Sequence, residues 1–186
     1  MSLPPKNIRV LHVYKTYYPD TTGGVEMVLY QLMCALKPMG VESRLLVLSP
    51  VASPVPIERP EAQVIRCQTT LEIASNPMSL PALGEFKRQL DWADIVHYQF
   101  PWPFGDLLHL LYGRRKPSVV SYQSDVVRQK TLMRLYRPLM RRFLASVDRV
   151  CATSPNYRET SAVLSQLRKR VEIIPNGLDT EIFPPS

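Results

Sequence analysis

The sequence predicts an α/β fold, a Rossmann-like parallel sheet with helices on both faces. Short apolar stretches alternate along the chain with longer stretches whose apolar residues recur at helical spacing. Strands that alternate with helices in this way form right-handed βαβ units, in which the strands lie parallel. A chain of 186 residues, 45% of them hydrophobic, is enough for one domain with a core.

The first strand is predicted at residues 8–13, where apolar side chains alternate, and the first helix runs from Val25 to a stop at Gly40. The remaining strands are expected at residues 43–48, 64–67, 95–98, 118–122, 149–153 and 171–174. The other helices are expected at residues 82–92, 106–112, about 126–147 and 155–168. Prolines predict loops at 52–61 and 99–104, and Pro138 predicts a kink or restart of its helix.

The stretch 14–26, YKTYYPDTTGGVE, lies between the first strand and the first helix. Its Gly23-Gly24 pair is placed at the helix N-terminus, where unpaired N–H groups and a partial positive charge suit a phosphate or carboxylate. Glycine also lets the backbone approach a ligand closely. The alternative is a simple tight turn, because the glycine spacing of a dinucleotide fingerprint and the P-loop lysine are both absent.

Four segments follow strands of the predicted sheet: residues 14–24, 99–104, 123–125 and 154–156. Ligands of parallel sheets bind at the carboxyl ends of the strands, so these segments are expected to converge on one site. The polar and irregular stretch 69–81 is expected to fold over that site.

Each candidate in these segments has a structural alternative. His97 lies in an apolar strand, where a core histidine with satisfied hydrogen bonds is the alternative to a base. Trp102 and Phe104 are either a sugar-stacking surface or a cover for the sheet edge. Asp125 is either a ligand or the N-cap of the next helix, and Asn176-Gly177 is interpreted as a turn.

Net charge and cysteine content narrow the class of partner and the cellular compartment. The formal charge of +7 favours an anionic partner: nucleic acid, an acidic membrane surface or a phosphorylated substrate. The three cysteines are expected to be reduced residues of a cytoplasmic protein, and they form no metal-binding motif. No apolar run is long enough to span a bilayer, and residues 1–6 are interpreted as a leader.

A basic face is predicted on the helix near residues 126–147, a stretch without any acidic residue. Its members follow helical spacing: Lys130, Arg134, Arg137 and Arg141. The apolar residues of the opposite face are Leu132, Tyr136, Leu139, Phe143 and Val147. The face is either solvated or binds the anionic leaflet of a membrane, where each cation contributes about 1 kcal/mol. Nucleic acid is not expected, because no binding motif is present.

The ordered motifs resemble glycosyltransferase family 4, retaining enzymes of GT-B fold. The resemblance is carried by Y-P-x-x-x-G-G-x-E and by DIVHYQFPWP (94–103), SYQSD (121–125), TSPNY (153–157) and IIPNGLD (174–179). It implies that residues 1–186 are a single N-terminal, acceptor-binding domain, that 178–186 begin the interdomain linker, and that a donor-binding C-terminal domain is absent. The isolated domain would then be inactive.

The resemblance also implies roles for individual residues. Gly23, Gly24 and Glu26 would contact the donor, and Gln123 and Asp125 occupy catalytic positions. The residues expected at the acceptor are Tyr17, Tyr18, His97, Gln99 and Trp102. Gln99 and Gln123 replace histidines of the family pattern, and glutamine cannot take a proton near neutral pH.

The resemblance therefore predicts a metal-independent glycosyltransferase without a cofactor. Its partners would be a nucleotide-sugar donor, a glycan or lipid-linked acceptor and an anionic membrane surface, with a cytoplasmic location at the inner membrane face. Surface polysaccharide assembly is the expected setting. The two replaced histidines motivate an alternative, a non-catalytic relative that binds a glycan or an anionic membrane. A nucleic-acid-binding domain is a third hypothesis.

Overall fold

A computed structural model of the chain describes residues 7–51, 55–125 and 130–177, without the side chains of 130–133 and 168–170. Its main sheet has eight strands in the order β10-β9-β8-β7-β1-β2-β4-β3. The strands are β1 (Ile8–Val13), β2 (Val41–Ser49), β3 (Ile57–Glu58), β4 (Gln63–Gln68), β7 (Ile95–Phe100), β8 (Ser118–Tyr122), β9 (Arg149–Ala152) and β10 (Val171–Ile173). All neighbours pair in parallel except β3, which runs antiparallel to β4.

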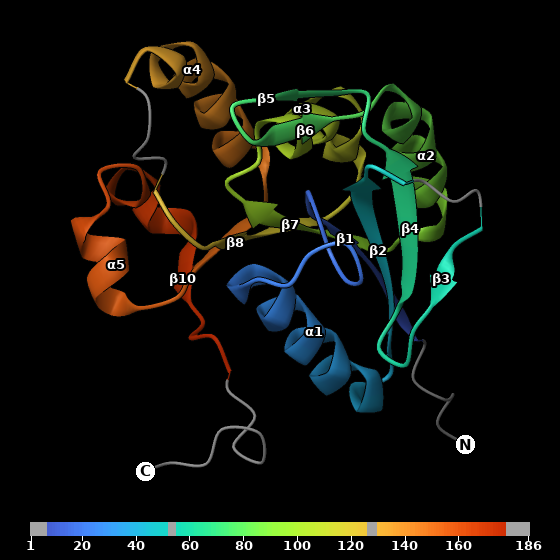
Figure 1. Cartoon of the computed structure of the whole chain (residues 1–186). Helices are drawn as coiled ribbons and strands as arrows, with labels where there is room; N and C mark the ends of the chain where they lie inside the picture. The colour runs from blue at the N-terminus through green and yellow to red at the C-terminus, as the bar shows by residue number, and fades with distance from the viewer. Residues whose placement is uncertain (1–6, 52–54, 126–129, 178–186) are drawn as a thin grey trace.

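Helices cover both faces of the sheet, as predicted (Figure 1). The α-helices are α1 (Gly24–Leu36), α2 (Leu80–Trp92), α3 (Pro103–Leu111), α4 (Lys130–Ser146) and α5 (Pro155–Thr160). Three short 3-10 helices come after α1, α3 and α5, at Lys37–Met39, Gly113–Arg115 and Leu164–Arg170. In Figure 1, α1 lies on one face of the sheet and α2, α3 and α4 lie on the other.

Alternation along the strands divides the core into two clusters. On β7, Tyr98 and Phe100 join the larger cluster, together with Phe86 of α2 and Phe143 of α4. The smaller cluster lies under α1 and includes Leu29 and Met33 of that helix. Because successive side chains of a strand point to opposite faces, His97 and Gln99 of β7 point toward the α1 face.

Three of the predicted loops contain regular structure, and the first of them, residues 52–61, includes the short strand β3. The stretch 69–81 is not irregular, because β5 (Leu71–Ile73) and β6 (Asn76–Met78) pair there as an antiparallel hairpin. Its turn is formed by Ala74 and Ser75, both with positive φ. Residues 99–104 are not a continuous loop either: β7 extends through Phe100, and Pro103 starts α3, a position where a missing N–H costs nothing.

Two predicted helices also differ from the structure. Residues 155–168 form two segments, because α5 ends at Thr160 and a 3-10 helix begins at Leu164. Between them, the Ser161 hydroxyl accepts a hydrogen bond from the N–H of Leu164, the first residue of the second segment. The expected restart at Pro138 is absent, since α4 continues through this residue.

Three of the predicted features fall outside the described residues: the leader at 1–6, the start of the helix at 126–129 and the linker at 178–186. Within the described part of the chain, no helix has the length and apolar content needed to cross a bilayer.

Candidate functional site

The candidate site lies at the carboxyl edge of the sheet, where the four predicted segments meet. They follow β1, β7, β8 and β9, which are consecutive neighbours in the sheet and run parallel. A backbone hydrogen bond joins two of these segments, since Gln123 N–H donates to the Phe100 carbonyl at 3.1 Å. The tertiary structure thus assembles the site from segments far apart in the sequence, as expected for a parallel sheet.

The glycine pair forms the start of α1. Gly23 is the N-cap residue and has extended backbone, and no side chain caps this helix end. The N–H groups of the first turn are therefore available to an anionic ligand. A Cβ atom on Gly24 would meet nothing within 4 Å, so the protein itself does not require glycine there.

Glu26 is directed into the loop that precedes α1. Its Oε1 accepts hydrogen bonds from the hydroxyls of Thr16, at 2.9 Å, and Thr21, at 2.8 Å. The side chain is only 7% exposed. Its Oε2 lies 2.5 Å from the place that a Cβ on Gly23 would occupy. A Cβ at position 23 would therefore force the Glu26 carboxylate to move.

Tyr17 and Tyr18, the two tyrosines expected at the acceptor, pack on the core of the α1 face. Tyr17 is fully buried, its hydroxyl donates to Glu61 at 3.1 Å, and burial together with Glu61 raises its pKa. Tyr18 packs edge-on against Tyr17 and Tyr30. The expectation that Tyr17 faces the acceptor is corrected, because its ring is inaccessible and its hydroxyl has a partner.

A chain of side-chain amides crosses the carboxyl ends of β7, β8 and β10. Gln123 Nε2 donates to Gln99 Oε1 at 3.0 Å, and Asn176 Nδ2 approaches Gln123 Oε1 at 3.4 Å. Gln99 is 2% exposed, and its Nε2 is buried without a partner among the described residues. The sequence interpretation of Asn176 as a turn residue missed this contact. The signal that places it at the site is its position just after β10, at the same sheet edge.

Asp125 is tied to its surroundings by three contacts. Its Oδ1 accepts from the hydroxyls of Tyr122, at 2.6 Å, and Ser161, at 2.9 Å, while its N–H donates to the Tyr157 hydroxyl. Burial, followed by the bond to Asp125, raises the pKa of Tyr122. Asp125 thus fixes the exit of β8 against α5. Its role as an N-cap concerns residues outside the described part of the chain.

Trp102 covers the sheet edge and does not offer a stacking surface. It is 1% exposed, and its Nε1 donates to the Pro77 carbonyl of the hairpin at 3.1 Å. Phe104 packs against it with the ring centroids 5.6 Å apart. The expectation that Trp102 binds the acceptor is corrected, because the ring is buried and its single polar atom already has a partner in the hairpin.

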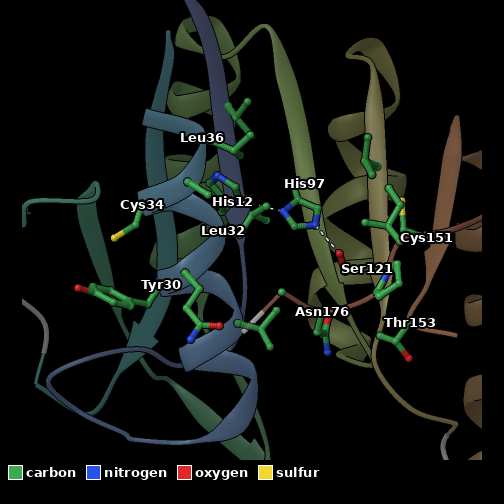
Figure 2. A pocket seen from close by; sticks show the side chains of 18 of the residues that line it. His12, Tyr30, Leu32, Cys34, Leu36, His97, Ser121, Cys151, Thr153 and Asn176 are labelled. Carbon is green, nitrogen blue, oxygen red and sulfur yellow. Dashed lines mark hydrogen bonds between the residues drawn. The ribbon is translucent and has the colours of Figure 1, made fainter. Parts of the chain in front are cut away.

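His97 lies on the floor of a cavity of about 740 Å³ beside α1, at the face of the sheet that α1 leaves open (Figure 2). Its Nδ1 lies 2.9 Å from Nδ1 of His12, and its Nε2 lies 2.8 Å from the Ser121 hydroxyl. Burial lowers the pKa of His97 to about 4; burial and then the neighbouring His97 lower the pKa of His12. Both imidazoles are therefore neutral at pH 7. Of the two interpretations of His97, a base or a core histidine with satisfied hydrogen bonds, the structure favours the second, because both ring nitrogens have partners.

The arginines of the predicted basic face are exposed on α4. These are Arg134, Arg137 and Arg141, and Arg142 is exposed beside them. Tyr136, Phe143 and Val147 are buried on the opposite side, as predicted. The side chains of Lys130 and Leu132 lie outside the described residues. No ion pair in the described part of the chain involves any of the four arginines, and the intervening Leu135 is 77% exposed.

Comparison of the sequence identifies its relatives. The family model of Glycosyltransferase Family 4 matches residues 22–182. The chain is 46% identical over 177 residues to the D-rhamnosyltransferase WbpZ of Pseudomonas aeruginosa, and 47% identical over 172 residues to the O-antigen chain mannosyltransferase C of Escherichia coli. These alignments include 95% and 92% of the chain but only 46% of each relative. The chain thus spans about half the length of the curated relatives it matches.

Solved structures share the fold at low sequence identity. Sucrose-phosphate synthase from Thermosynechococcus elongatus aligns with a TM-score of 0.69 and 16% identity, covering 96% of this chain and 50% of that one. Anabaena HepE in complex with UDP and glucose aligns with a TM-score of 0.62 and 14% identity, covering 96% and 47%. The fold is therefore shared with half of each of these larger structures, as predicted for one half of a GT-B fold.

Proposed function

Because the chain belongs to Glycosyltransferase Family 4, we propose that it forms the acceptor-binding half of an enzyme that transfers a sugar from a nucleotide-sugar. The acceptor is a glycan or a lipid-linked glycan of surface polysaccharide assembly. The names of the two curated relatives, a D-rhamnosyltransferase and an O-antigen chain mannosyltransferase, support this setting. Since the chain spans about half of each relative, we assign most contacts to the nucleotide base to the other half of such an enzyme.

The observation that carries this proposal is the uncapped first turn of α1 at the carboxyl edge of the sheet. Its N–H groups suit the phosphates of a nucleotide-sugar. Gln123 lies at the same edge, where the buried Gln99 holds it, and offers its amide group to sugar hydroxyls. Neither glutamine can act as a general base, so we propose that the departing phosphate takes the proton from the acceptor hydroxyl. Gln123 then orients the sugar, and Asp125 holds the loop that carries Gln123.

The direct test is sugar transfer by the protein expressed as its gene encodes it. Donors of mannose and of D-rhamnose are offered with a lipid-linked oligosaccharide acceptor. We expect transfer from at least one donor. Gly24→Val should reduce transfer strongly, because its side chain enters space that the ligand needs, while Gly84→Val, at an equally uncrowded and exposed glycine of α2, should not. Folded protein that transfers no sugar from any donor would refute the proposal.

The second candidate function is a non-catalytic glycan-binding relative, and the two glutamines motivate it. Its test is the double change Gln99→His and Gln123→His. If the parent is inactive and the double variant transfers sugar, the protein is a binding relative that lost its catalytic side chains. If the parent is active and the double variant is no better, the glutamines belong to a working site.

We also propose that the basic face of α4 contacts an anionic membrane at the inner side. Four exposed arginines without acidic partners in the described structure support this, as does Leu135, which is positioned to enter the interface. The test is sedimentation with anionic and with neutral vesicles. Arg134→Glu, Arg137→Glu and Arg141→Glu together should abolish binding to anionic vesicles. The matched control changes Lys87, Arg114 and Arg115 to glutamate, three exposed cations on other elements, and should retain it.

A further inference from the structure

We propose that Glu26 is a positioning residue, which holds the loop 14–23 against the first turn of α1 through the hydroxyls of Thr16 and Thr21. The inference rests on the proposed function, in which that first turn faces the phosphates of the donor. It differs from the expected role of Glu26 as a group that contacts the donor itself.

The geometry of the carboxylate supports this role. Glu26 occupies the third helical position after the N-cap Gly23, from which a glutamate commonly bonds back to the N-cap N–H. Here Oε1 instead accepts from Thr16 and Thr21, and among the hydrogen bonds of the described residues none joins the carboxylate to the backbone of the first turn. The loop is therefore tied down while the N–H groups of the helix end remain available.

A direct contact with a phosphate is disfavoured on two grounds. The carboxylate and the phosphate are both anions, and their repulsion is strong in a partly buried site. Oε1 already receives two hydroxyl donors, and Oε2 lies against Gly23, inside the loop. Glu26 acts on the ligand through the shape of the loop, and the helix end acts on it directly.

The proposal predicts how two substitutions at this position differ. The side chain introduced by Glu26→Gln keeps an oxygen that accepts from both threonines, whereas alanine removes the acceptor altogether. We therefore expect Glu26→Gln to retain the loop and Glu26→Ala to release it. A role that needed the negative charge would be lost equally in both variants.

Backbone hydrogen exchange of residues 16–24 is the first measurement. Glu26→Ala should accelerate exchange by at least about tenfold, and Thr21→Val, which deletes one of the two donors, should have a smaller effect. Glu26→Gln should stay near the parent. The control is Glu85→Ala, which removes a carboxylate with two partners on α2 and should leave the loop unchanged.

Unaltered exchange in Glu26→Ala, or equal acceleration in Glu26→Gln, would overturn the proposal. If Glu26→Ala does not fold, the comparison of Thr16→Val and Thr21→Val with Glu26→Gln decides instead. Faster exchange in both threonine variants, with Glu26→Gln near the parent, supports the proposal, and parental exchange in both threonine variants overturns it.

Transfer kinetics of the protein expressed as its gene encodes it give the second readout. Glu26→Ala should raise KM for the nucleotide-sugar by about tenfold or more. Glu26→Gln, in contrast, should have a KM near that of the parent. A glutamine variant as impaired as the alanine variant would assign the charge a direct role and overturn the proposal. If the parent transfers no sugar, the proposed function fails, while the exchange experiment still decides whether Glu26 holds the loop.

Discussion

Nδ1 of His12 lies 2.9 Å from Nδ1 of His97, between adjacent strands and at the floor of the cavity beside α1 (Figure 2). One ring must donate and the other accept, so the accepting ring must be unprotonated at Nδ1. Protonation of either ring would place a cation in a buried site, and protonation of the accepting nitrogen would also break the contact. The pair therefore makes the fold sensitive to acid.

This sensitivity has a definite sign. The pKa of His97 in the folded protein is lowered to about 4, below its unfolded value near 6.5, so the unfolded chain binds more protons as the pH falls. The contribution of neutral His97 to the free energy of unfolding is therefore complete above about pH 6.5, and it is lost progressively as the pH falls toward 4. Urea unfolding at several pH values should show a steeper loss for the parent than for His97→Gln, by about 1.4 kcal/mol per pH unit. Equal slopes would contradict the prediction.

The two glycines of the loop are expected to differ in their tolerance of alanine. Gly24→Ala should leave the free energy of unfolding unchanged or raise it by up to about 1 kcal/mol, since its Cβ meets nothing. Gly23→Ala should destabilise by about 1–3 kcal/mol, because its Cβ would collide with the Glu26 carboxylate. In a Glu26→Ala background, Gly23→Ala should lower the free energy of unfolding by less. Additive effects in this double-mutant cycle would show that the carboxylate is not the obstacle.

A buried carboxyl group links α3 to α4. Asp106 accepts a hydrogen bond from the Tyr136 hydroxyl, and burial raises the pKa of Asp106 well above its usual value, against the lowering effect of that bond. The folded state then binds a proton that the unfolded state releases, so this contribution to stability declines as the pH rises above about 4. Asp106→Asn should gain stability relative to the parent from pH 5 to pH 8 in thermal unfolding. Tyr136→Phe is the contrasting variant and should be less stable than the parent. If the stability of Asp106→Asn relative to the parent falls as the pH rises, the raised pKa of Asp106 is contradicted.

Gln99 is expected to serve function at the expense of stability. Its Nε2 is buried without a partner in the described structure, and such a group costs about 1–3 kcal/mol. Gln99→Leu should therefore change the free energy of unfolding by less than about 1 kcal/mol, or raise it, while it reduces sugar transfer. Chemical unfolding and initial rates measured on the same preparation check both parts. A large loss of stability would show that the amide is structural.

Trp102 is expected to act on stability alone. Trp102→Ala should destabilise by about 3–5 kcal/mol, since it removes a fully buried ring and its hydrogen bond to the hairpin. Trp102→Phe should recover part of this loss. At a temperature where both variants are folded, KM for the acceptor should equal that of the parent. A raised KM in a folded variant would reinstate Trp102 as a binding residue.

The order of the seven predicted strands along the chain, and the sheet edge at which the candidate site lies, were predictable from the sequence, whereas β3, β5 and β6 were not. Periods of two and of 3.6 residues are local properties, and the parallel arrangement follows from the alternation of strands with helices. The glycine pair at the start of α1 was predictable for the same reason, since a strand end and a helix start enclose it. The exposed arginines of α4 also follow from spacing alone.

Only the tertiary structure decided which side chains of those segments meet. Gln123 contacts Gln99 across 24 residues and Asn176 across 53, and His12 meets His97 across 85. Such contacts depend on strand order and register, which no local pattern encodes. The burial of Trp102 was decided in the same way, by a hairpin formed from a stretch without clear periodicity. Local periodicity therefore determined the scaffold and the site's edge, and long-range packing determined which groups a ligand can reach.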